Sequence, residues 1–217
     1  MRATGLDHRH ASLMGCRLAA LLFTLFTGVA FAEPDQRPAF VPWPQDYQAG
    51  TGTCVIGNGK RIVYEDQSLA PLAAILANDI RMATAVLMSA AQGKAATHEI
   101  ALSLDNKLAK ESYVLTVTDR GVLVVGQNYN AVAMGTATLL QSMSRNEKGE
   151  IVVPAYVVKD WCFAEFSGLM LDIAREDHSM EVLRDVIDLC RFYKTAISGC
   201  TSRMTRLVCF LSRLFLR

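Results

Sequence analysis

The 217 residues leave room for one or two domains, but not for a complete (β/α)8 barrel together with another domain. Hydrophobic residues make up 51% of the chain, which is ample for a core. The formal net charge of +1 gives no electrostatic argument for binding nucleic acid or an acidic membrane, so we expect neither as a partner.

The N-terminus has the features of a secretory signal peptide. Arginines precede an apolar run over residues 18–32, which ends in the small residues Ala30 and Ala32 that a signal peptidase recognises. The run is short for a membrane span and polar residues follow it. We therefore expect residues 1–32 to be a signal peptide, the mature protein to be secreted or periplasmic, and no stable membrane anchor.

The sequence predicts no metal site and no cofactor. Five cysteines follow the signal peptide, and their spacing fits neither a zinc site nor a recognisable disulfide framework; they are Cys54, Cys162, Cys190, Cys200 and Cys209. We interpret them as buried thiols with at most one disulfide. The acidic pair before His178 is better explained as a solvated helix N-terminus capped by Ser179 than as a ligand set.

Residues 38–161 have the pattern of a compact α+β domain. An extended, proline-containing segment over 40–47 comes first. It is followed by a strand at 61–66, a helix at 68–86, a strand at 98–105, a hairpin at 112–126, a helix at 130–144 and a strand at 151–161. Gly121 can take the positive φ that the hairpin turn needs. Strands grouped with two helices predict a small sheet covered by helices.

The segment "SGLMLDIAREDHSMEVLRDVIDLCRFYK" over 167–194 predicts a buried strand, a loop and an amphipathic helix. Asp172 and Arg175 stand at the C-terminal end of the strand, and Ser179 caps the helix. The apolar stripe of the helix is Leu183, Val186, Ile187, Cys190 and Tyr193. A strand followed at once by a helix is the first βα unit of a parallel α/β architecture, in which polar residues at strand ends face the active site.

This segment resembles the start of the catalytic barrel in family 20 glycoside hydrolases, the β-N-acetylhexosaminidases and chitobiases. "VPWPQDY", "YVLTVTDRGVLVVGQN" and "AVAMGTATLLQ" are similar to motifs of the preceding family domain and occur in the same order. The resemblance covers 38–194. It implies an α+β domain over 38–161, followed over 162–195 by the first βα unit of a (β/α)8 barrel that is incomplete in this chain.

The resemblance also implies an activity and a site. Family members remove terminal β-linked N-acetylhexosamine by substrate-assisted catalysis, so we expect an amino-sugar glycan or a chitin oligosaccharide as the partner. Asp172 and Arg175 match family positions, and a structural ion pair within the barrel is an equally good explanation for both. Ser167 stands where the family has a sugar-binding arginine. The catalytic Asp-Glu pair of the family belongs to a later strand that this chain does not include.

The sequence after Lys194 departs from the family. If each codon's last base joins the first two bases of the next, permitted codons from Ala196 to Arg206 spell Tyr-Leu-x-Leu-His-Leu-Thr-Asp-Asp-Glu-Ala, which is similar to the family's second barrel strand. The step from Met204 to Thr205 necessarily gives aspartate in that frame. We therefore expect 196–217 to be an out-of-frame tail, and this polypeptide to be an inactive fragment.

Two other functions remain open from the sequence. The chain could be a secreted non-catalytic module that binds carbohydrate or a partner through residues 38–161, or a helper subunit completed by a separate barrel. One βα unit cannot bury its own apolar faces. We therefore expect its strand and helix to stay partly exposed except where they pack on the 38–161 domain.

Overall fold

The structure is a computed structural model that describes residues 37–164, 167–172, 178–195 and 197–201. The signal-peptide prediction, Arg175 and most of the predicted out-of-frame tail lie outside these ranges. Within them, no helix is long and apolar enough to cross a membrane.

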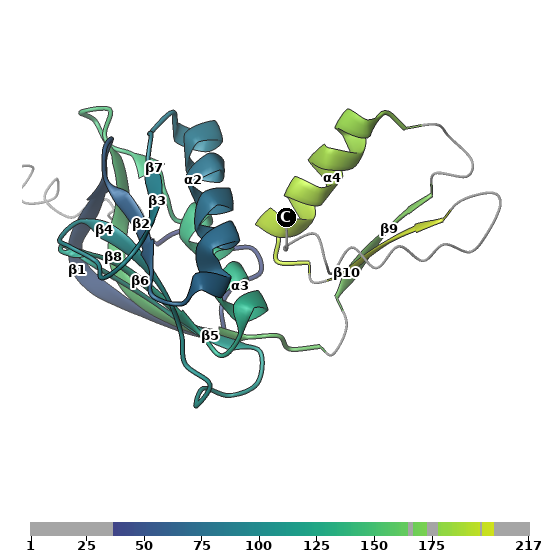
Figure 1. Cartoon of the computed structure of the whole chain (residues 1–217), viewed down its shortest axis with the longest axis horizontal. Coiled ribbons are helices and arrows are strands. Elements are labelled where there is room, and N and C mark those ends of the chain that lie inside the picture. Colours follow the sequence, from purple (N-terminus) through teal and green to yellow (C-terminus); the bar gives the residue numbers. More distant parts are fainter. Residues whose placement is uncertain (1–36, 165–166, 173–177, 196, 202–217) are drawn as a thin grey trace, which may run out of the picture. The chain divides into compact units, whose positions relative to one another are not determined.

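An eight-stranded mixed sheet forms the centre of residues 37–161 (Figure 1). Its strands are β1 (Asp46–Ile56), β2 (Arg61–Tyr64), β3 (Ser89–Gln92), β4 (Glu99–Leu104), β5 (Ser112–Thr118), β6 (Gly121–Gly126), β7 (Ser144–Arg145) and β8 (Ile151–Trp161). The spatial order is β1-β8-β5-β6-β4-β2-β3, and β7 pairs with β8. The half from β1 to β6 is antiparallel, and β6, β4, β2 and β3 run parallel to one another.

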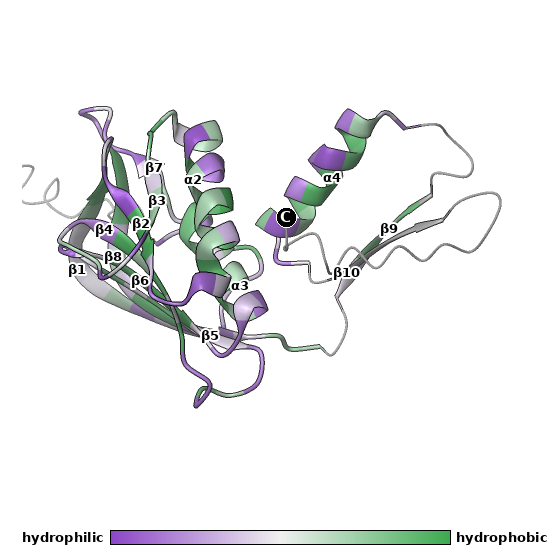
Figure 2. Ribbon diagram, in the orientation of Figure 1, coloured by the Kyte–Doolittle hydropathy of each residue, from purple (hydrophilic) through white to green (hydrophobic). Residues whose placement is uncertain are grey.

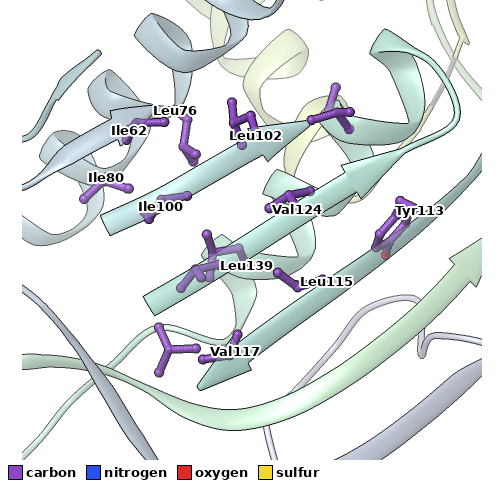
Figure 3. Packing of buried hydrophobic residues seen from close by; sticks show 14 of the residues in the cluster. Ile62, Leu76, Ile80, Ile100, Leu102, Tyr113, Leu115, Val117, Val124 and Leu139 are labelled. Carbon is purple, nitrogen blue, oxygen red and sulfur yellow. The ribbon is translucent and has the colours of Figure 1, made fainter. Parts of the chain in front are cut away.

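Two helices, α2 (Ala70–Thr84) and α3 (Tyr129–Gln141), pack on the sheet and complete its core (Figure 1). A short 3-10 turn, Gln67–Leu69, leads into α2, and Asn128 caps α3 by accepting a hydrogen bond from the Ala131 amide at 2.9 Å. Side chains of alternate sheet positions face these helices (Figure 3), among them Ile62, Ile100, Leu102, Leu115 and Val124. All five are at most 1% exposed.

Close approach of the helix to the sheet depends on two glycines. A Cβ at Gly126 would lie 2.5 Å from the backbone nitrogen of Val132, and one at Gly135 would lie 2.5 Å from a methyl carbon of Val124. Because α3 and β6 meet at these positions, a larger residue at either would force the two layers apart.

The predicted helix-covered sheet is confirmed, but the sheet is larger than the small one expected. The predicted strands at 61–66, 98–105 and 151–161, the hairpin with Gly121 at positive φ, and both helices are present. The sequence analysis missed β1, β3 and β7. In α2, Leu72, Leu76 and Ile80 are buried, whereas Ala83 is exposed near the end of the helix at Thr84.

After β8 the chain forms a second, two-stranded parallel sheet with a helix between its strands in sequence. The elements are β9 (Gly168–Asp172), α4 (Met180–Phe192) and β10 (Ile197–Thr201). The register pairs Ile197 with Gly168 and Thr201 with Asp172. The predicted strand and helix are therefore present, and β10 adds a strand within the region expected to be out of frame.

Helix α4 is amphipathic, with hydrophilic and hydrophobic residues along its length (Figure 2). The Ser179 hydroxyl accepts a hydrogen bond from the Val182 amide at 3.3 Å, which confirms the predicted cap. Leu183, Val186 and Ile187 are half-buried. Tyr193, predicted on the buried stripe, is instead 46% exposed. The helix ends at Phe192, so Tyr193 no longer follows the helical periodicity.

Candidate functional site

The first candidate site is the C-terminal end of β9, where the sequence places its polar residues. Asp172 is the last residue of β9 and lies opposite Thr201, the last residue of β10. The two parallel strands therefore end at one edge, as a site at strand C-termini requires. Ser167 is exposed and immediately precedes β9. Arg175 lies outside the described residues, so its pairing with Asp172 stays a prediction.

The described residues hold no cluster of three or more histidine, cysteine or acidic side chains that could bind a metal ion. Of the cysteines whose side chains the structure describes, Cys54 and Cys162 are free thiols, and Cys190 is buried at the end of α4. Burial raises the pKa of Cys54 and Cys162, and nearby carboxylates raise it further, so neither thiol is activated as a nucleophile. The interpretation as buried thiols is confirmed for Cys54 and Cys190, whereas Cys162 is only half-buried.

The second candidate site is a set of polar side chains that holds the C-terminal end of α4 against the domain. We call it the α4 docking site: Asp79 on α2, Thr136 and Gln141 on α3, and Asp160 on β8, with their partners Arg191, Phe192 and Lys194 on α4 and the residues after it. The domain contributes two acids and the helix contributes two bases, so the charges across this contact are complementary.

Asp160 is the most completely bonded residue of the docking site. One carboxylate oxygen accepts hydrogen bonds from the amides of Gln45 at 3.2 Å and Trp161 at 3.0 Å. The other accepts from the Tyr113 hydroxyl at 2.8 Å and from Lys194 Nζ at 3.1 Å. Both ends of the ion pair are buried, with side-chain exposures of 10% for Asp160 and 4% for Lys194. These four hydrogen bonds offset the cost of placing a carboxylate away from water.

Tyr113 extends this network into the core. It is the direct cross-strand neighbour of Asp160 in the β5–β8 ladder, and its hydroxyl also lies 2.5 Å from Thr138 Oγ1 on α3. Burial, followed by the charge of Asp160, raises the pKa of Tyr113 well above its ordinary value. The phenol therefore stays protonated and donates to the carboxylate, so that the network joins β5, β8, α3 and the residue Lys194 that follows α4.

Arg191 makes the second buried ion pair. Its Nε donates to Asp79 at 2.8 Å and its Nη2 donates to Thr136 Oγ1 at 3.2 Å. The Arg191 side chain is 9% exposed, and its Nη1 is buried without a hydrogen-bond partner among the described residues. On the neighbouring turn, burial and then the charges of Asp79 and Asp185 raise the pKa of Asp188.

Gln141 joins three segments through one side-chain amide. Its Nε2 donates to the carbonyl oxygens of Val41 at 2.8 Å and Phe192 at 2.6 Å, and its Oε1 accepts from the Val41 amide at 2.9 Å. The end of α3, the extended segment before β1 and the end of α4 are thus bonded to one residue.

The sequence pattern did not predict the docking site. Arg191 and Lys194 are ordinary basic residues at a helix C-terminus, where cations are favoured by the helix dipole alone. Helical spacing could not have placed Lys194 beside Arg191, because α4 ends at Phe192 and Lys194 lies beyond it; the sequence offers only two basic residues close to the buried Cys190. The site has the composition of a structural junction, since it brings together no nucleophile and general base.

Residues 37–161 match the family model described as "Glycosyl hydrolase family 20, domain 2". This range is more than half of the chain and coincides with the eight-stranded sheet and its helices. The domain bounds predicted from the sequence, 38–161, differ from this match by one residue. The match assigns the sheet and its two helices to this named domain of the family. It does not extend to the β9–α4–β10 unit.

Curated relatives and solved structures agree with this match. The chain is 33% identical over 126 residues to "Lacto-N-biosidase" of Bifidobacterium bifidum, covering 56% of this chain and 11% of that protein. It is 24% identical over 192 residues to "Beta-hexosaminidase" of Porphyromonas gingivalis, covering 84% and 24%. The chain therefore spans less than a quarter of the length of these two relatives.

Among solved structures, the GH20 exo-β-N-acetylglucosaminidase of Vibrio harveyi, in complex with N-acetylglucosamine, superposes with a TM-score of 0.67 at 19% identity. The superposition covers 74% of this chain and 25% of that one. At this identity the likeness establishes the fold, whereas the match over residues 37–161 establishes membership. The chain belongs to glycosyl hydrolase family 20 and contains domain 2 of that family.

Proposed function

We propose that this chain is part of an exo-acting β-N-acetylhexosaminidase, a glycosidase that removes terminal β-linked N-acetylhexosamine from glycans or chitin oligosaccharides. The observation that carries the proposal is the domain 2 match over residues 37–161, followed in the chain by a parallel strand–helix–strand unit. The relatives named beta-hexosaminidase and beta-N-acetylhexosaminidase support the same reaction. We propose a secreted or periplasmic location from the predicted signal peptide.

The proposed chemistry is substrate-assisted. The acetamido oxygen of the bound sugar attacks the anomeric carbon, the bond from that carbon to the leaving oxygen breaks, and a glutamic acid protonates the leaving oxygen. Water then opens the resulting oxazolinium ion. This is an exception to the scheme in which the enzyme supplies two carboxylates, one of them as nucleophile or base. An aspartate beside the glutamate orients the acetamide.

Neither of these two residues can be assigned within the 217 residues, so we propose that this polypeptide is inactive. Asp172 and Arg175 belong, in this proposal, to the strand end that lines the sugar site. The contribution of the β9–α4–β10 unit is therefore structural, as the first part of a barrel whose later strands carry the acid and the orienting carboxylate. Both groups act only when they are held together around the sugar.

The test is restoration of the shifted reading frame near Thr195. The frame-restored protein should release the chromophore from an aryl N-acetyl-β-glucosaminide, and the 217-residue chain should release none. An aryl lacto-N-bioside serves as the second substrate, because one relative is named for that activity. If the restored protein folds and cleaves neither substrate, the proposed activity is wrong even though the family is right.

A substitution at Ser167 tests whether this position contacts the sugar. A charge-assisted hydrogen bond to a sugar hydroxyl contributes about 1.5–3 kcal/mol, so Ser167→Arg in the restored protein should tighten binding of the N-acetylhexosaminide about tenfold or more. The expected signature is a lower KM. An unchanged KM would mean that position 167 does not contact the sugar.

A further inference from the structure

Lys194 occupies a backbone conformation that favours glycine. Its φ is +57°, in the left-handed region, immediately after α4 has ended. The Thr195 amide donates to the Cys190 carbonyl at 2.8 Å and the Lys194 amide donates to the Arg191 carbonyl at 3.1 Å, which closes the last turn. Glycine is the usual residue at such a position, because a residue with a Cβ is strained there.

The side chain of Lys194 offsets this strain. It is 4% exposed, and its ammonium group donates to Asp160 at 3.1 Å and to the Pro42 carbonyl at 3.4 Å. If Lys194 were only a helix terminus, glycine would serve better. Its burial in this conformation therefore indicates that the ion pair, rather than the cap, is what position 194 contributes.

Lys194 lies close in sequence to β10. Two residues separate Lys194 from Ile197, where β10 begins its parallel pairing with Gly168. Three Cα–Cα steps of about 3.8 Å reach at most about 11 Å. A shift of two residues in a parallel ladder moves a strand by about 6.6 Å, and a shift of one residue reverses its faces. A fixed Lys194 therefore confines the start of β10 to within this reach, which leaves only a few neighbouring registers available.

We propose that Lys194 is a positioning residue. Its buried ion pair with Asp160 fixes the start of β10, and thereby the register that aligns the ends of β9 and β10 at Asp172 and Thr201. The ion pair acts on the backbone that follows Lys194, so the same constraint applies to a strand encoded by either reading frame. The claim that this edge lines a sugar site rests on the proposed function. The positioning role of Lys194 does not depend on it.

Two substitutions separate positioning from capping. Lys194→Met removes the charge and keeps an unbranched side chain, whereas Lys194→Gly removes the charge and also relieves the backbone strain. Lys159→Met is the matched control, since Lys159 is exposed on β8 next to Asp160. Amide hydrogen exchange and backbone nuclear Overhauser effects are measured in the 217-residue chain.

In both Lys194 variants the β10 amide hydrogens should exchange at least tenfold faster than in the parent, while the amides of β4 to β6 keep their protection. The nuclear Overhauser effects that join Ile197 to Gly168 should weaken or shift, and Lys159→Met should change neither. This register signal distinguishes positioning from a general loss of stability. Exchange in Lys194→Gly that is equal to or slower than in the parent would overturn the proposal, because it would show a cap alone.

A double-mutant cycle tests the partner. In an Asp160→Asn background, Lys194→Met should accelerate β10 exchange by less than threefold, since the interaction is already absent. Undiminished acceleration in that background would also overturn the proposal. The experiment measures no activity, so a failure of the hexosaminidase assay and a failure of the positioning role are observed separately.

Discussion

Two buried tyrosines offer a matched test of the polar network in the core. Tyr113 and Tyr156 are each 1% exposed, and each hydroxyl bonds to a side chain within the domain. Tyr113 donates to the carboxylate of Asp160 at 2.8 Å, whereas the hydroxyl of Tyr156 lies 2.7 Å from the neutral hydroxyl of Ser142. Replacement by phenylalanine removes a single oxygen at both positions, and at Tyr113 it also removes the contact with Thr138 Oγ1, so the difference in stability reports the charged partner together with that contact.

The expected magnitudes follow from what each substitution leaves behind. After Tyr113→Phe, Asp160 keeps two amide donors and Lys194 but loses one charge-assisted bond, at a cost of about 1.5–3 kcal/mol. After Tyr156→Phe, Ser142 still donates to the Leu139 carbonyl, so the loss is that of a neutral bond, about 0.5–1.5 kcal/mol. Tyr113→Phe should therefore cost more by about 1 kcal/mol.

Urea unfolding of the two variants and the parent chain, followed by far-ultraviolet circular dichroism, measures these free energies. The slopes of the three unfolding curves must agree for the comparison to hold. A loss in Tyr156→Phe equal to or greater than that in Tyr113→Phe would refute the reasoning. Because burial raises the pKa of both phenols, their contribution is complete below the unfolded pKa of about 10 and declines as the pH rises above it.

Three further substitutions test the elements around the core. The hydrogen bond from Arg61 lowers the pKa of Glu99, so this pair stabilises the fold above the unfolded pKa of about 4.3, and its contribution is lost as the pH falls through the lower folded value. Glu99→Gln should flatten that part of the stability–pH curve, and an unchanged curve would contradict the assignment. Gly126→Ala should cost about 1–3 kcal/mol in urea unfolding, because the new Cβ meets the backbone of α3. Gly57→Ala, with open space around it, is the control and should cost less than half as much. Asn128→Ala should remove the cap of α3 and lower the free energy of unfolding by about 1 kcal/mol, whereas Asn128→Ser, which keeps an acceptor for the Ala131 amide and places no carboxylate beside Glu111, should retain most of it.

The sequence by itself determined the elements whose periodicity and turn chemistry are local. Alternation of apolar residues identified β4 and the β5–β6 hairpin, Gly121 marked the turn, and residues 151–161 were expected to be extended, as β8 is. Ser179 identified the start of α4, since a serine before an amphipathic run can satisfy the free amides of the first turn. The ordered motifs also led to the family, and the match over residues 37–161 confirmed it.

Only the tertiary structure decided the remainder. Strand β3, with the sequence Ser-Ala-Ala-Gln, has no strand-forming side chains and exists because β2 supplies its parallel hydrogen bonds. Much of β1 is exposed and rich in glycine and threonine, so its sequence shows no apolar alternation. The strand is defined by its pairing with β8. The α4 docking site depends on acids that lie 34 and 112 residues away from their basic partners. Burial turned Arg191 and Lys194 from surface cations into buried ion-pair partners, because only the folded chain brings Asp79 and Asp160 to meet them.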